Sequence, residues 1–317
     1  MAYNFAVIGV GGYIAPRHLK AIRDTKNHLV AATDPNDSVG MLDQFGFDVK
    51  FFTEIERFDR HLEKLRRGPE ANRVNYVSIC SPNYLHDSHC RLAMRAGADA
   101  ICEKPLVINP WNLDQMEDIE VETGHRIYTV LQLRIHPELV KLKQSIQESI
   151  RSGQHDVVLT YITSRGGWYH ISWKGQPEKS GGVATNIGIH LFDLLLWLFG
   201  SAGDIKIYRA DDKSMSGFIE LEHARVRWFL SVDSNDLPFP AQAGMKTTFR
   251  SITVDGKEIE FSEGFADLHT RVYEEILAGR GFGISDARPS IELTHRLRTA
   301  QISPLDSLAH PKLFTKP

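Results

Sequence analysis

The sequence predicts an α/β chain with two parts: an N-terminal domain on a doubly wound parallel sheet, and a C-terminal α+β domain on a mostly antiparallel open sheet. Strands and helices alternate through the first 134 residues, a glycine-rich turn follows the first strand, and the hydrophobic period changes near residue 135. The 317 residues also suffice for two domains of roughly 150 residues each. We therefore expect domains at residues 1–134 and 135–317.

The N-terminal part alternates short apolar strands with helices. Asn4–Val10 is a continuous apolar run that ends in glycines, which is typical of a parallel strand buried on both faces. Such alternation implies right-handed crossovers and therefore a doubly wound sheet. Further strands are expected at residues 28–34, 49–53, 75–81, 99–103 and 126–133, and helices at about 15–25, 86–96 and 112–122.

The C-terminal part has a different pattern. Residues 137–152 predict a helix, whereas residues 156–163 are rich in β-forming side chains. Residues 224–232 alternate apolar and polar side chains, and residues 251–261 predict a hairpin around a tight Asp-Gly turn. This part is therefore α+β, and we assign no element to the segment after residue 301.

Composition and charge exclude several classes of protein. Apolar residues make up 42% and charged residues 24%, which are ordinary globular values and exclude disorder as the main organisation. The 37 Lys and Arg residues nearly balance the 40 Asp and Glu residues, giving a net charge of −3. No bulk charge therefore points to nucleic acid or an anionic membrane, and we expect neither as a partner.

The cysteines and the apolar segments indicate a cytoplasmic protein. Cys80, Cys90 and Cys102 form neither a disulfide framework nor a Cys-x-x-Cys pair, which favours a reducing compartment. The N-terminus has no basic region before its apolar stretch, so it resembles a strand rather than a signal peptide. The most apolar stretch, Leu191–Phe199, is too short to span a membrane and predicts a buried helix.

A glycine motif directly follows the first strand. Glycines at this point allow a tight turn and let backbone N–H groups approach a pyrophosphate at a helix N-terminus. Asp34 ends the second strand, where a carboxylate accepts hydrogen bonds from ribose hydroxyls and repels a 2′-phosphate, so NAD is favoured over NADP. The alternative is a glycine turn with a capping aspartate. The predicted cofactor residues here are Gly9, Gly11, Gly12, Tyr13, Ile14, Asp34 and Asn36.

Two polar segments follow the fourth and fifth strands, at the sheet edge where ligands bind. The first is Ser81-Pro-Asn83-Tyr-Leu-His86, which could equally be a Pro-Asn turn that caps a helix. The second is Glu103-Lys104-Pro, which places Lys104 to meet a substrate oxygen beside the nicotinamide. Glu103 can be an ion-pair partner or contact the cofactor. The alternative is a surface lysine before a loop.

A helix expected to start near Thr185 carries polar side chains in an otherwise apolar segment. Asn186 and His190 lie four residues apart and share a helix face, and Asp193 follows. Histidine suits exchange of a hydroxyl proton near neutral pH, and a carboxylate one turn away can set its tautomer. The alternative is a buried histidine with a structural role. No third ligand for a metal is evident, so we expect none.

A loop rich in glycine, aromatic and basic residues follows the strand at residues 156–163. It contains Arg165, Trp168, Tyr169 and Lys174. Its cations could meet a carboxylate or a phosphate, although a packed surface loop would have the same composition. The basic cluster at residues 64–67 predicts only a solvated helix end.

Together these motifs resemble the Gfo/Idh/MocA family of NAD(P)-dependent sugar oxidoreductases, which have a Rossmann domain with an E-K-P motif and a second domain with a GG…N-x-G-x-H-x-x-D helix. Here the motifs match at Glu103-Lys104-Pro105 and Gly181–Asp193. The resemblance is closer to one subgroup, the UDP-N-acetylglucosaminuronate 3-dehydrogenases of the WlbA/WbpB type. The stretches that carry it are Gly12–His18, Val77–His86, Ile101–Val107, Tyr161–Gly166, Gly182–His190, Arg225–Asp233 and Ser251–Gly256.

The resemblance implies that the C3 hydroxyl of UDP-2-acetamido-2-deoxy-D-glucuronate is oxidised by NAD, in the synthesis of a bacterial surface polysaccharide such as O-antigen. In that reaction His190 would be the base and Lys104 the cation on the reacting oxygen, although the reverse assignment stays open. Asn186 would orient the substrate. The remaining expected cofactor contacts are Ser81, Asn83, His86, Glu103, Lys104, Gln132 and Trp168, and the expected substrate contacts are Lys104, Arg165, Tyr169, Lys174, Asn186 and His190.

Two alternatives remain. The first is another substrate within the same family, such as an inositol or a free hexose. The second is a non-catalytic NAD-binding regulator, against which the presence of both Lys104 and His190 argues. The open sheet of the second domain, with Trp228 in one of its strands, must pack against something, so we expect a homo-oligomer, a dimer or a tetramer.

Overall fold

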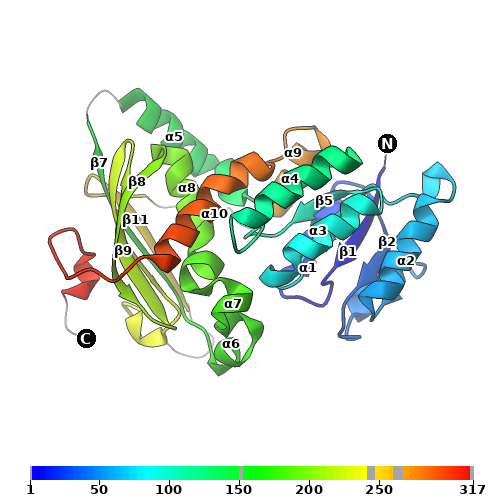
Figure 1. Cartoon of the computed structure of the whole chain (residues 1–317), viewed down its shortest axis with the longest axis horizontal. Coiled ribbons are helices and arrows are strands. Elements are labelled where there is room, and N and C mark those ends of the chain that lie inside the picture. Colours follow the sequence, from blue (N-terminus) through cyan, green and yellow to red (C-terminus); the bar gives the residue numbers. More distant parts are fainter. Residues whose placement is uncertain (1, 150–152, 241–246, 260–266, 315–317) are drawn as a thin grey trace. The chain divides into compact units, whose positions relative to one another are not determined.

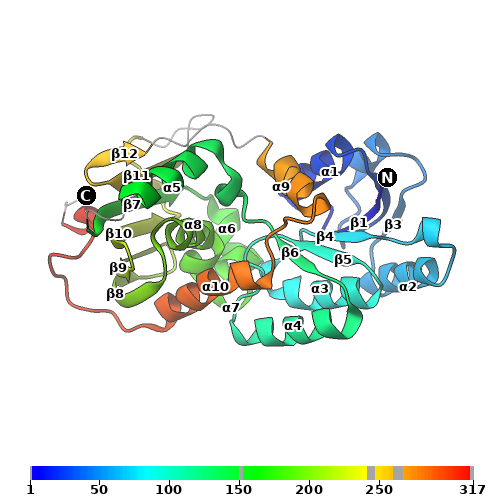
Figure 2. The same ribbon diagram turned by 90° about the horizontal axis from the view of Figure 1, so that it is seen from above.

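The computed structural model describes residues 2–149, 153–240, 247–259 and 267–314. The chain forms two compact units, shown in two views in Figures 1 and 2. Unit 1 comprises Met1–Ile135 and Ala266–Arg288, and unit 2 comprises His136–Phe265 and Pro289–Pro317. The predicted division at 1–134 and 135–317 therefore misses a segment that returns to the first unit.

The returning segment belongs to unit 1 because helix α9 (Leu268–Leu277) packs against helix α1 (Ala15–Asp24). Val272, Tyr273 and Ile276 of α9 share one hydrophobic core cluster with residues of α1 and β1 (Asn4–Ile8). Together with α1, this helix covers one face of the first sheet.

The sheet of unit 1 has six parallel strands in the order β3-β2-β1-β4-β5-β6. This is the order of a doubly wound dinucleotide-binding sheet, so the predicted architecture is confirmed. The order reverses between β1 and β4, which places the carboxyl ends of these strands at the switch point. The other strands are β2 (His28–Thr33), β3 (Lys50–Phe52), β4 (Tyr76–Ile79), β5 (Asp99–Cys102) and β6 (Ile127–Thr129).

Helices cover both faces of this sheet. In Figure 2, α1 and α9 lie on one face, and α3 and α4 lie on the other. Gly124 ends α4 in the left-handed region at φ 71°, which is the conformation that a helix-ending glycine adopts without strain. The helices on the second face are α2 (Ile55–Arg66), α3 (His86–Arg95) and α4 (Trp111–Thr123).

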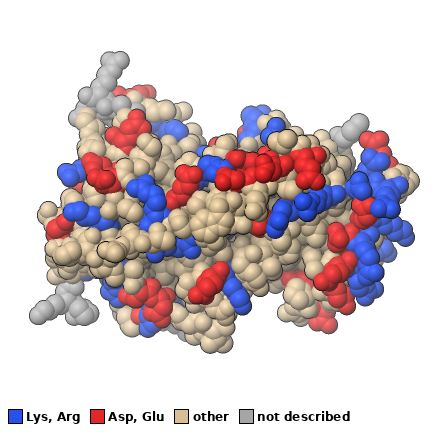
Figure 3. Space-filling model, in the orientation of Figure 1, with Lys and Arg blue, Asp and Glu red and all other residues tan. Residues whose placement is uncertain are grey.

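The basic cluster at residues 64–67 ends helix α2, as predicted. Arg66 and Arg67 pair with Glu63, and the hydrogen bonds from these arginines lower the pKa of the Glu63 carboxyl to about 2. In Figure 3 both blue and red side chains lie over α2. The cluster is therefore a solvated helix end whose arginines are paired with a carboxylate.

The second sheet has the order β12-β11-β7-β10-β9-β8. Its strand pairs are antiparallel except for β7 and β10, so the predicted mostly antiparallel sheet is confirmed. β8 and β9 were not predicted. The strands are β7 (His155–Thr163), β8 (Ala202–Ala210), β9 (Ser214–Leu221), β10 (Ala224–Ser231), β11 (Thr248–Val254) and β12 (Lys257–Ile259).

The predicted hairpin forms between β11 and β12. Asp255 and Gly256 at its turn have φ of 50° and 78°, as a tight turn with two left-handed residues requires. The last two residues expected in this hairpin, 260 and 261, lie outside the described residues, as do residues 150–152 of the helix expected at 137–152. The described part of that helix is α5 (Pro137–Ser149).

Helices α5 and α8 (Ile189–Phe199) pack against each other in unit 2. Phe192 of α8 meets Trp228 of β10 edge to face, with ring centroids 5.1 Å apart. Trp228 is fully buried within this unit, so its burial supplies no evidence for oligomerisation. Pro177–Phe199 is long and apolar enough to cross a membrane by composition, yet 78% of its most apolar window is buried, as in a core helix.

The C-terminal segment, to which the sequence assigned nothing, lies along the opposite face of this sheet. It follows helix α10 (Ile284–Thr299). Ile302 bridges to Ile207 of β8, and Ala309 packs with Tyr208 and Phe218. Its anchor is Asp306, which pairs with Lys206 and accepts a hydrogen bond from the Tyr208 hydroxyl. The segment could not be predicted because the residues that make its contacts follow no hydrophobic period.

We expect Asp306→Asn to loosen this C-terminal segment while the sheet stays folded. The hydrogen bonds from Lys206 and Tyr208 lower the pKa of Asp306 to about 2, so its contribution is full above the ordinary value of 3.8 and is lost as pH falls through about 2. Amide hydrogen exchange should therefore rise in residues 302–314 of the variant. Asp204→Asn, an exposed site on β8, is the control; equal exchange in both variants would contradict the role of Asp306.

Candidate functional site

The glycine turn after β1 packs closely against the end of β4. Gly9 has φ +82°, and a Cβ on it would lie 2.7 Å from the Ser81 backbone nitrogen and 2.8 Å from the Cys80 carbonyl carbon. Only glycine fits this position, because both its conformation and its space exclude a side chain. The turn is thereby held at the switch point of the sheet.

Asp34 lies beside this turn, as predicted. One of its carboxylate oxygens accepts the Gly11 backbone N–H at 2.9 Å, and the other accepts the Asn36 N–H at 2.9 Å. A Cβ on Gly11 would lie 3.1 Å from the Asp34 carboxyl carbon. The bare backbone of the turn therefore faces a carboxylate at the end of β2, which is the arrangement that holds a dinucleotide.

The start of α1 completes a cradle for an anion. Within the described residues no side chain caps this helix, whose first turn contains Ala15 and Pro16. The positive end of the helix dipole favours a phosphate at such a terminus. Tyr13 is 87% exposed beside the turn, and Ile14 packs into the core. These residues fit the pyrophosphate and adenosine half of NAD.

The predicted residues after β4 divide into two kinds. His86 is fully buried, and its two ring nitrogens contact the backbone carbonyls of Pro105 at 2.6 Å and Ser81 at 2.8 Å. The two ring nitrogens of His86 thus connect the segment after β4 to the segment after β5, and burial lowers the pKa of the ring. Ser81 contacts His89 at 2.8 Å. Ser81 and Asn83 remain at the sheet edge as candidates for the nicotinamide half.

Glu103 is buried at the end of β5 and receives hydrogen bonds from two histidines. One carboxylate oxygen lies 3.0 Å from His18 Nε2 and 2.9 Å from His269 Nε2. Burial opposes ionisation of Glu103, but these hydrogen bonds outweigh it and hold the pKa of the carboxyl well below its usual range. The structure thus shows Glu103 as the hydrogen-bond acceptor of two histidines.

Sequence reasoning missed His18 and His269 as members of this site. His18 lies in the Gly12–His18 stretch and could have been noticed there, whereas His269 belongs to a helix that no motif marked. The ligand atoms of His18, Glu103 and His269 all lie within 4.8 Å of one another, a spacing that could also hold a metal ion. Lys104, half-buried, follows Glu103 directly, and its backbone N–H donates to the second oxygen of Glu103 at 3.2 Å.

In unit 2 the predicted polar helix begins differently than expected. A helix is present near Thr185, as expected, but its first part, Ala184–Gly188, is a π-helix that leads into α8. Glycine is needed at position 188, since a Cβ there would lie 2.5 Å from a Leu230 methyl group. Wider turns of this kind occur often at functional sites.

The polar side chains of this helix lie beside aromatic residues. The Asn186 amide donates to the Tyr169 hydroxyl at 2.9 Å, which fixes the amide group. The His190 ring stands nearly perpendicular to the Tyr161 ring, with centroids 5.7 Å apart. Burial raises the pKa of Tyr169, so its hydroxyl keeps its proton near neutral pH. Asp193 is buried on the same helix.

The glycine- and aromatic-rich segment after β7 contains two short helices, α6 (Gly167–Ile171) and α7 (Pro177–Ser180). The Lys174 ammonium lies 4.1 Å from the centroid of the Trp173 ring and 5.8 Å from that of Trp168. Trp168 is 52% exposed, and Arg165 is half-buried at the end of β7. Aromatic rings thus hold one of the two predicted cations in place.

The structure therefore brings the predicted residues together within each unit. In unit 1 they gather at the carboxyl edge of the parallel sheet, where Gln132 begins the turn after β6. In unit 2 they lie on the π-helix, on α8 and in the segment after β7. The candidate residues of unit 2 are Arg165, Trp168, Tyr169, Lys174, Asn186 and His190.

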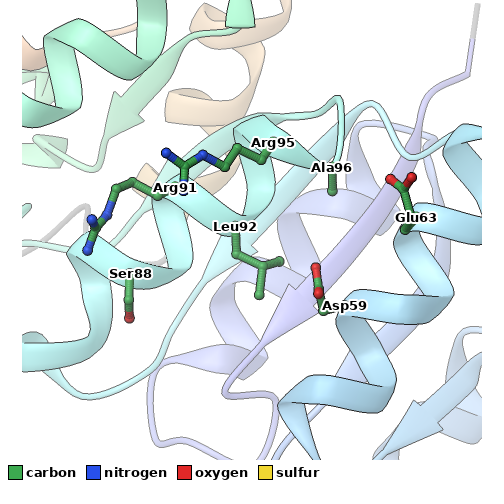
Figure 4. Close-up of a pocket in the computed structure, with 7 residues that line it drawn as sticks. All are labelled: Asp59, Glu63, Ser88, Arg91, Leu92, Arg95 and Ala96. Atoms are coloured by element: carbon green, nitrogen blue, oxygen red, sulfur yellow. The ribbon is translucent and has the colours of Figure 1, made fainter. Parts of the chain in front are cut away.

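A separate hollow of about 560 Å³ lies on unit 1 between α2 and α3. Figure 4 shows the Asp59 and Glu63 carboxylates on α2 and the Arg91 and Arg95 guanidinium groups pointing away from them. Its lining includes none of the predicted site residues, and it lies on the helical face rather than at the strand ends. We therefore do not assign the active site to this hollow.

The sequence matches two models of one oxidoreductase family. Residues 3–131 match its NAD-binding Rossmann fold, and residues 154–234 match its C-terminal alpha/beta domain; the family is Gfo/Idh/MocA. The D-glucoside 3-dehydrogenase of Escherichia coli (strain K12) is 28% identical over 138 residues, which are 41% of this chain and 37% of that enzyme. The chain thus matches less than two fifths of the length of the first curated relatives.

Solved structures extend the similarity over the whole chain. The WlbA (WbpB) dehydrogenase from Thermus thermophilus is 50% identical, with a TM-score of 0.92 over 98% of this chain and 99% of that one. It has been crystallised with NAD and alpha-ketoglutarate and with NAD and UDP-GlcNAcA. The WlbA dehydrogenase from Bordetella pertussis, 19% identical, has the same fold, with a TM-score of 0.74 over 96% of this chain and 98% of that one.

The resemblance that the sequence motifs predicted is thereby confirmed. The glycine turn with Asp34, the Glu103-Lys104-Pro105 strand end and the helix of Asn186 and His190 lie in the two domains that the family models describe. The chain belongs to the Gfo/Idh/MocA family of NAD-binding oxidoreductases.

Proposed function

We propose that this protein is an NAD-dependent dehydrogenase that oxidises the C3 hydroxyl of UDP-2-acetamido-2-deoxy-D-glucuronate to a ketone. The observation that carries this proposal is the 50% identity over 98% of the chain to a Thermus thermophilus dehydrogenase crystallised with NAD and UDP-GlcNAcA. The polar residues at the sheet edge and on the π-helix supply the groups that the reaction needs.

The reaction removes a hydride and a proton from one secondary alcohol. NAD, when bound, accepts the hydride. The imidazole of His190 takes the hydroxyl proton, and the Lys104 ammonium stabilises the negative charge that develops on the reacting oxygen. The opposite assignment, with Lys104 as the base, uses the same two residues.

Other residues of unit 2 orient the substrate. Asn186 is held by Tyr169, so its amide is already oriented before a sugar binds. Arg165 and Lys174 are the cations for the carboxylate or diphosphate of the UDP-sugar acid. A few local cations of this kind suffice for an anionic substrate even though the whole chain is nearly neutral, with a net charge of −3.

The proposed substrate is tested by measuring NADH formation with UDP-GlcNAcA, with myo-inositol and with free glucose. One arm contains alpha-ketoglutarate, because the Thermus relative was crystallised with it and tightly held NADH would otherwise be missed. Turnover of UDP-GlcNAcA alone, with the product identified as the 3-keto sugar nucleotide, supports the proposal. Turnover of inositol or glucose in its place would show that the protein acts on another substrate of the same family. NAD binding without turnover of any of the three would favour a non-catalytic regulator.

We expect Asp34→Ala to weaken NAD binding about 10- to 100-fold and to reduce the preference for NAD over NADP. The loss of a charged hydrogen-bond acceptor costs about 1.5–3 kcal/mol, and the negative charge no longer repels a 2′-phosphate. Titration of the protein fluorescence with each dinucleotide gives both constants. Asp37→Ala, an exposed neighbour, should leave them unchanged. Unaltered NAD affinity and preference in Asp34→Ala would refute the role of Asp34.

We further propose that the protein acts in the cytoplasm as a homo-oligomer, with a tetramer as the expected form, in the synthesis of a surface polysaccharide such as lipopolysaccharide O-antigen. An open sheet whose outer face is partly covered by the C-terminal segment can pair with a second copy. Multi-angle light scattering should give a mass at least twice the 35.8 kDa of one chain. A monomer at working concentration would contradict this.

A further inference from the structure

A buried chain of hydrogen bonds runs through unit 1 and ends at Glu103. The Ser78 hydroxyl lies 2.6 Å from the Tyr273 hydroxyl, which lies 2.7 Å from His18 Nδ1. His18 Nε2 lies 3.0 Å from one Glu103 oxygen, and His269 Nε2 lies 2.9 Å from the same oxygen. All five side chains are buried: Ser78, Tyr273 and His18 have no exposed surface, His269 is 2% exposed and Glu103 is 6% exposed.

The hydrogen bonds of this chain have one consistent direction. The Glu103 carboxylate can only accept, so both histidines donate through Nε2–H. Burial lowers the pKa of His18, so its Nδ1 carries no proton and accepts from the Tyr273 hydroxyl. Burial raises the pKa of Tyr273, which keeps the proton that it donates and accepts from Ser78. Each donor then has an acceptor, with the charge on Glu103.

Three elements distant in sequence meet in this chain. His18 lies on α1, directly after the glycine turn; Glu103 ends β5; and His269 and Tyr273 lie four residues apart on α9, on one helix face. A carboxylate buried at 6% exposure is costly unless donors surround it, so the position of Glu103 depends on α9. The second Glu103 oxygen accepts the backbone N–H of Lys104 at 3.2 Å.

We propose that His269, with His18 and Tyr273, is a positioning residue for Lys104: helix α9 anchors the Glu103 carboxylate, and Glu103 holds the backbone from which the Lys104 side chain reaches the reacting oxygen. The inference rests on the proposed role of Lys104. This role gives a reason for the return of α9 to the first unit, since His269 and Tyr273 of α9 complete the chain of hydrogen bonds. None of these residues touches the substrate.

The test compares His269→Leu with His269→Gln, because a glutamine amide can donate to Glu103 from near the Nε2 position and leucine cannot. A displacement of about 1 Å at a catalytic group can cost about 100-fold in rate. We expect kcat of His269→Leu to fall about 10- to 100-fold, with the Kd for NAD within about twofold of wild type. His269→Gln should recover most of kcat, and Tyr273→Phe should give an intermediate loss.

His125→Leu is the matched control. His125 bonds to Asp99 at 3.1 Å, and Asp99 begins the same strand that Glu103 ends. Removing this histidine–carboxylate contact should leave kcat unchanged. Equal kcat in His269→Leu and wild type, or equal losses in His269→Leu and His125→Leu, would overturn the proposal. A His269→Gln variant as slow as His269→Leu, with both folded by circular dichroism, would do the same.

A second readout needs no substrate and separates this proposal from the proposed function. After reductive methylation with ¹³C-formaldehyde, the signal of Lys104, assigned by its loss in Lys104→Arg, should shift in His269→Leu and stay in place in His125→Leu. A wild type that binds NAD but does not oxidise UDP-GlcNAcA would refute the proposed function alone, and this signal would still decide the positioning role. A stoichiometric metal in the purified protein, bound by these side chains, would overturn the hydrogen-bonded arrangement.

Discussion

Lys104→Ala should reduce NADH formation at least about 100- to 1,000-fold while NAD binding changes little. Removing one preorganised donor from a developing oxyanion costs this much in other enzymes. The Glu103 carboxylate accepts the backbone N–H of Lys104, so the backbone that carries this side chain is already in place when the substrate arrives. The glycine turn and Asp34, which hold the other half of the dinucleotide, do not involve this side chain.

Single-turnover kinetics with UDP-GlcNAcA and a separate titration with NAD distinguish loss of chemistry from loss of binding. Lys64→Ala, which removes an exposed lysine from α2, should behave as wild type. Lys104→Ala with full turnover would eliminate the proposed mechanism. A Lys104→Ala protein that no longer binds NAD would instead place this residue in the cofactor site.

His190→Ala should lower kcat about 100- to 10,000-fold, the range that a positioned general base contributes. His190 lies in the first turn of α8, two residues after the π-helix ends, and its ring packs perpendicular to Tyr161, so truncation removes the base and leaves the Tyr161 ring in place. NAD affinity should change little, since the predicted dinucleotide cradle lies in unit 1.

Rescue with small molecules would identify the residue that accepts the hydroxyl proton. If His190 is the base, added imidazole should restore part of the turnover of His190→Ala, and the acid limb of the pH profile should disappear in that variant. If Lys104 is the base, added alkylamines should restore Lys104→Ala instead. His223→Ala, at a partly exposed histidine of the same unit, is the control. Normal turnover in His190→Ala would exclude His190 from the reaction.

Much of unit 1 could be predicted because its signals are local. A continuous apolar run followed by glycines at Gly9 requires a buried strand and a tight turn, and Asp34 at the end of the next strand falls beside that turn in any doubly wound sheet. The edge position of Lys104 follows from the same topology. In unit 2 the alternation predicted β10, but it did not show that Trp228 is fully buried within the unit itself.

Other features follow from contacts that no local pattern records. His269 reaches Glu103 across 166 positions of sequence, and α9 looks like an ordinary amphipathic helix until its partners are known. The C-terminal segment packs by single residues such as Ala309 and has no period. The close approach of the Gly188 backbone to Leu230, beside the π-helix, is likewise a contact between distant elements.

Hydrophobic period, glycine placement and strand ends act over a few neighbouring positions, so they predicted the class of each sheet, the dinucleotide turn and the residues with reactive groups. Strands β8 and β9, the return of segment 266–288 to unit 1 and the hydrogen bonds from two histidines to Glu103 appear only in the folded chain. A buried carboxylate is stable only where donors converge on it, and here those donors come from helices far apart in the sequence.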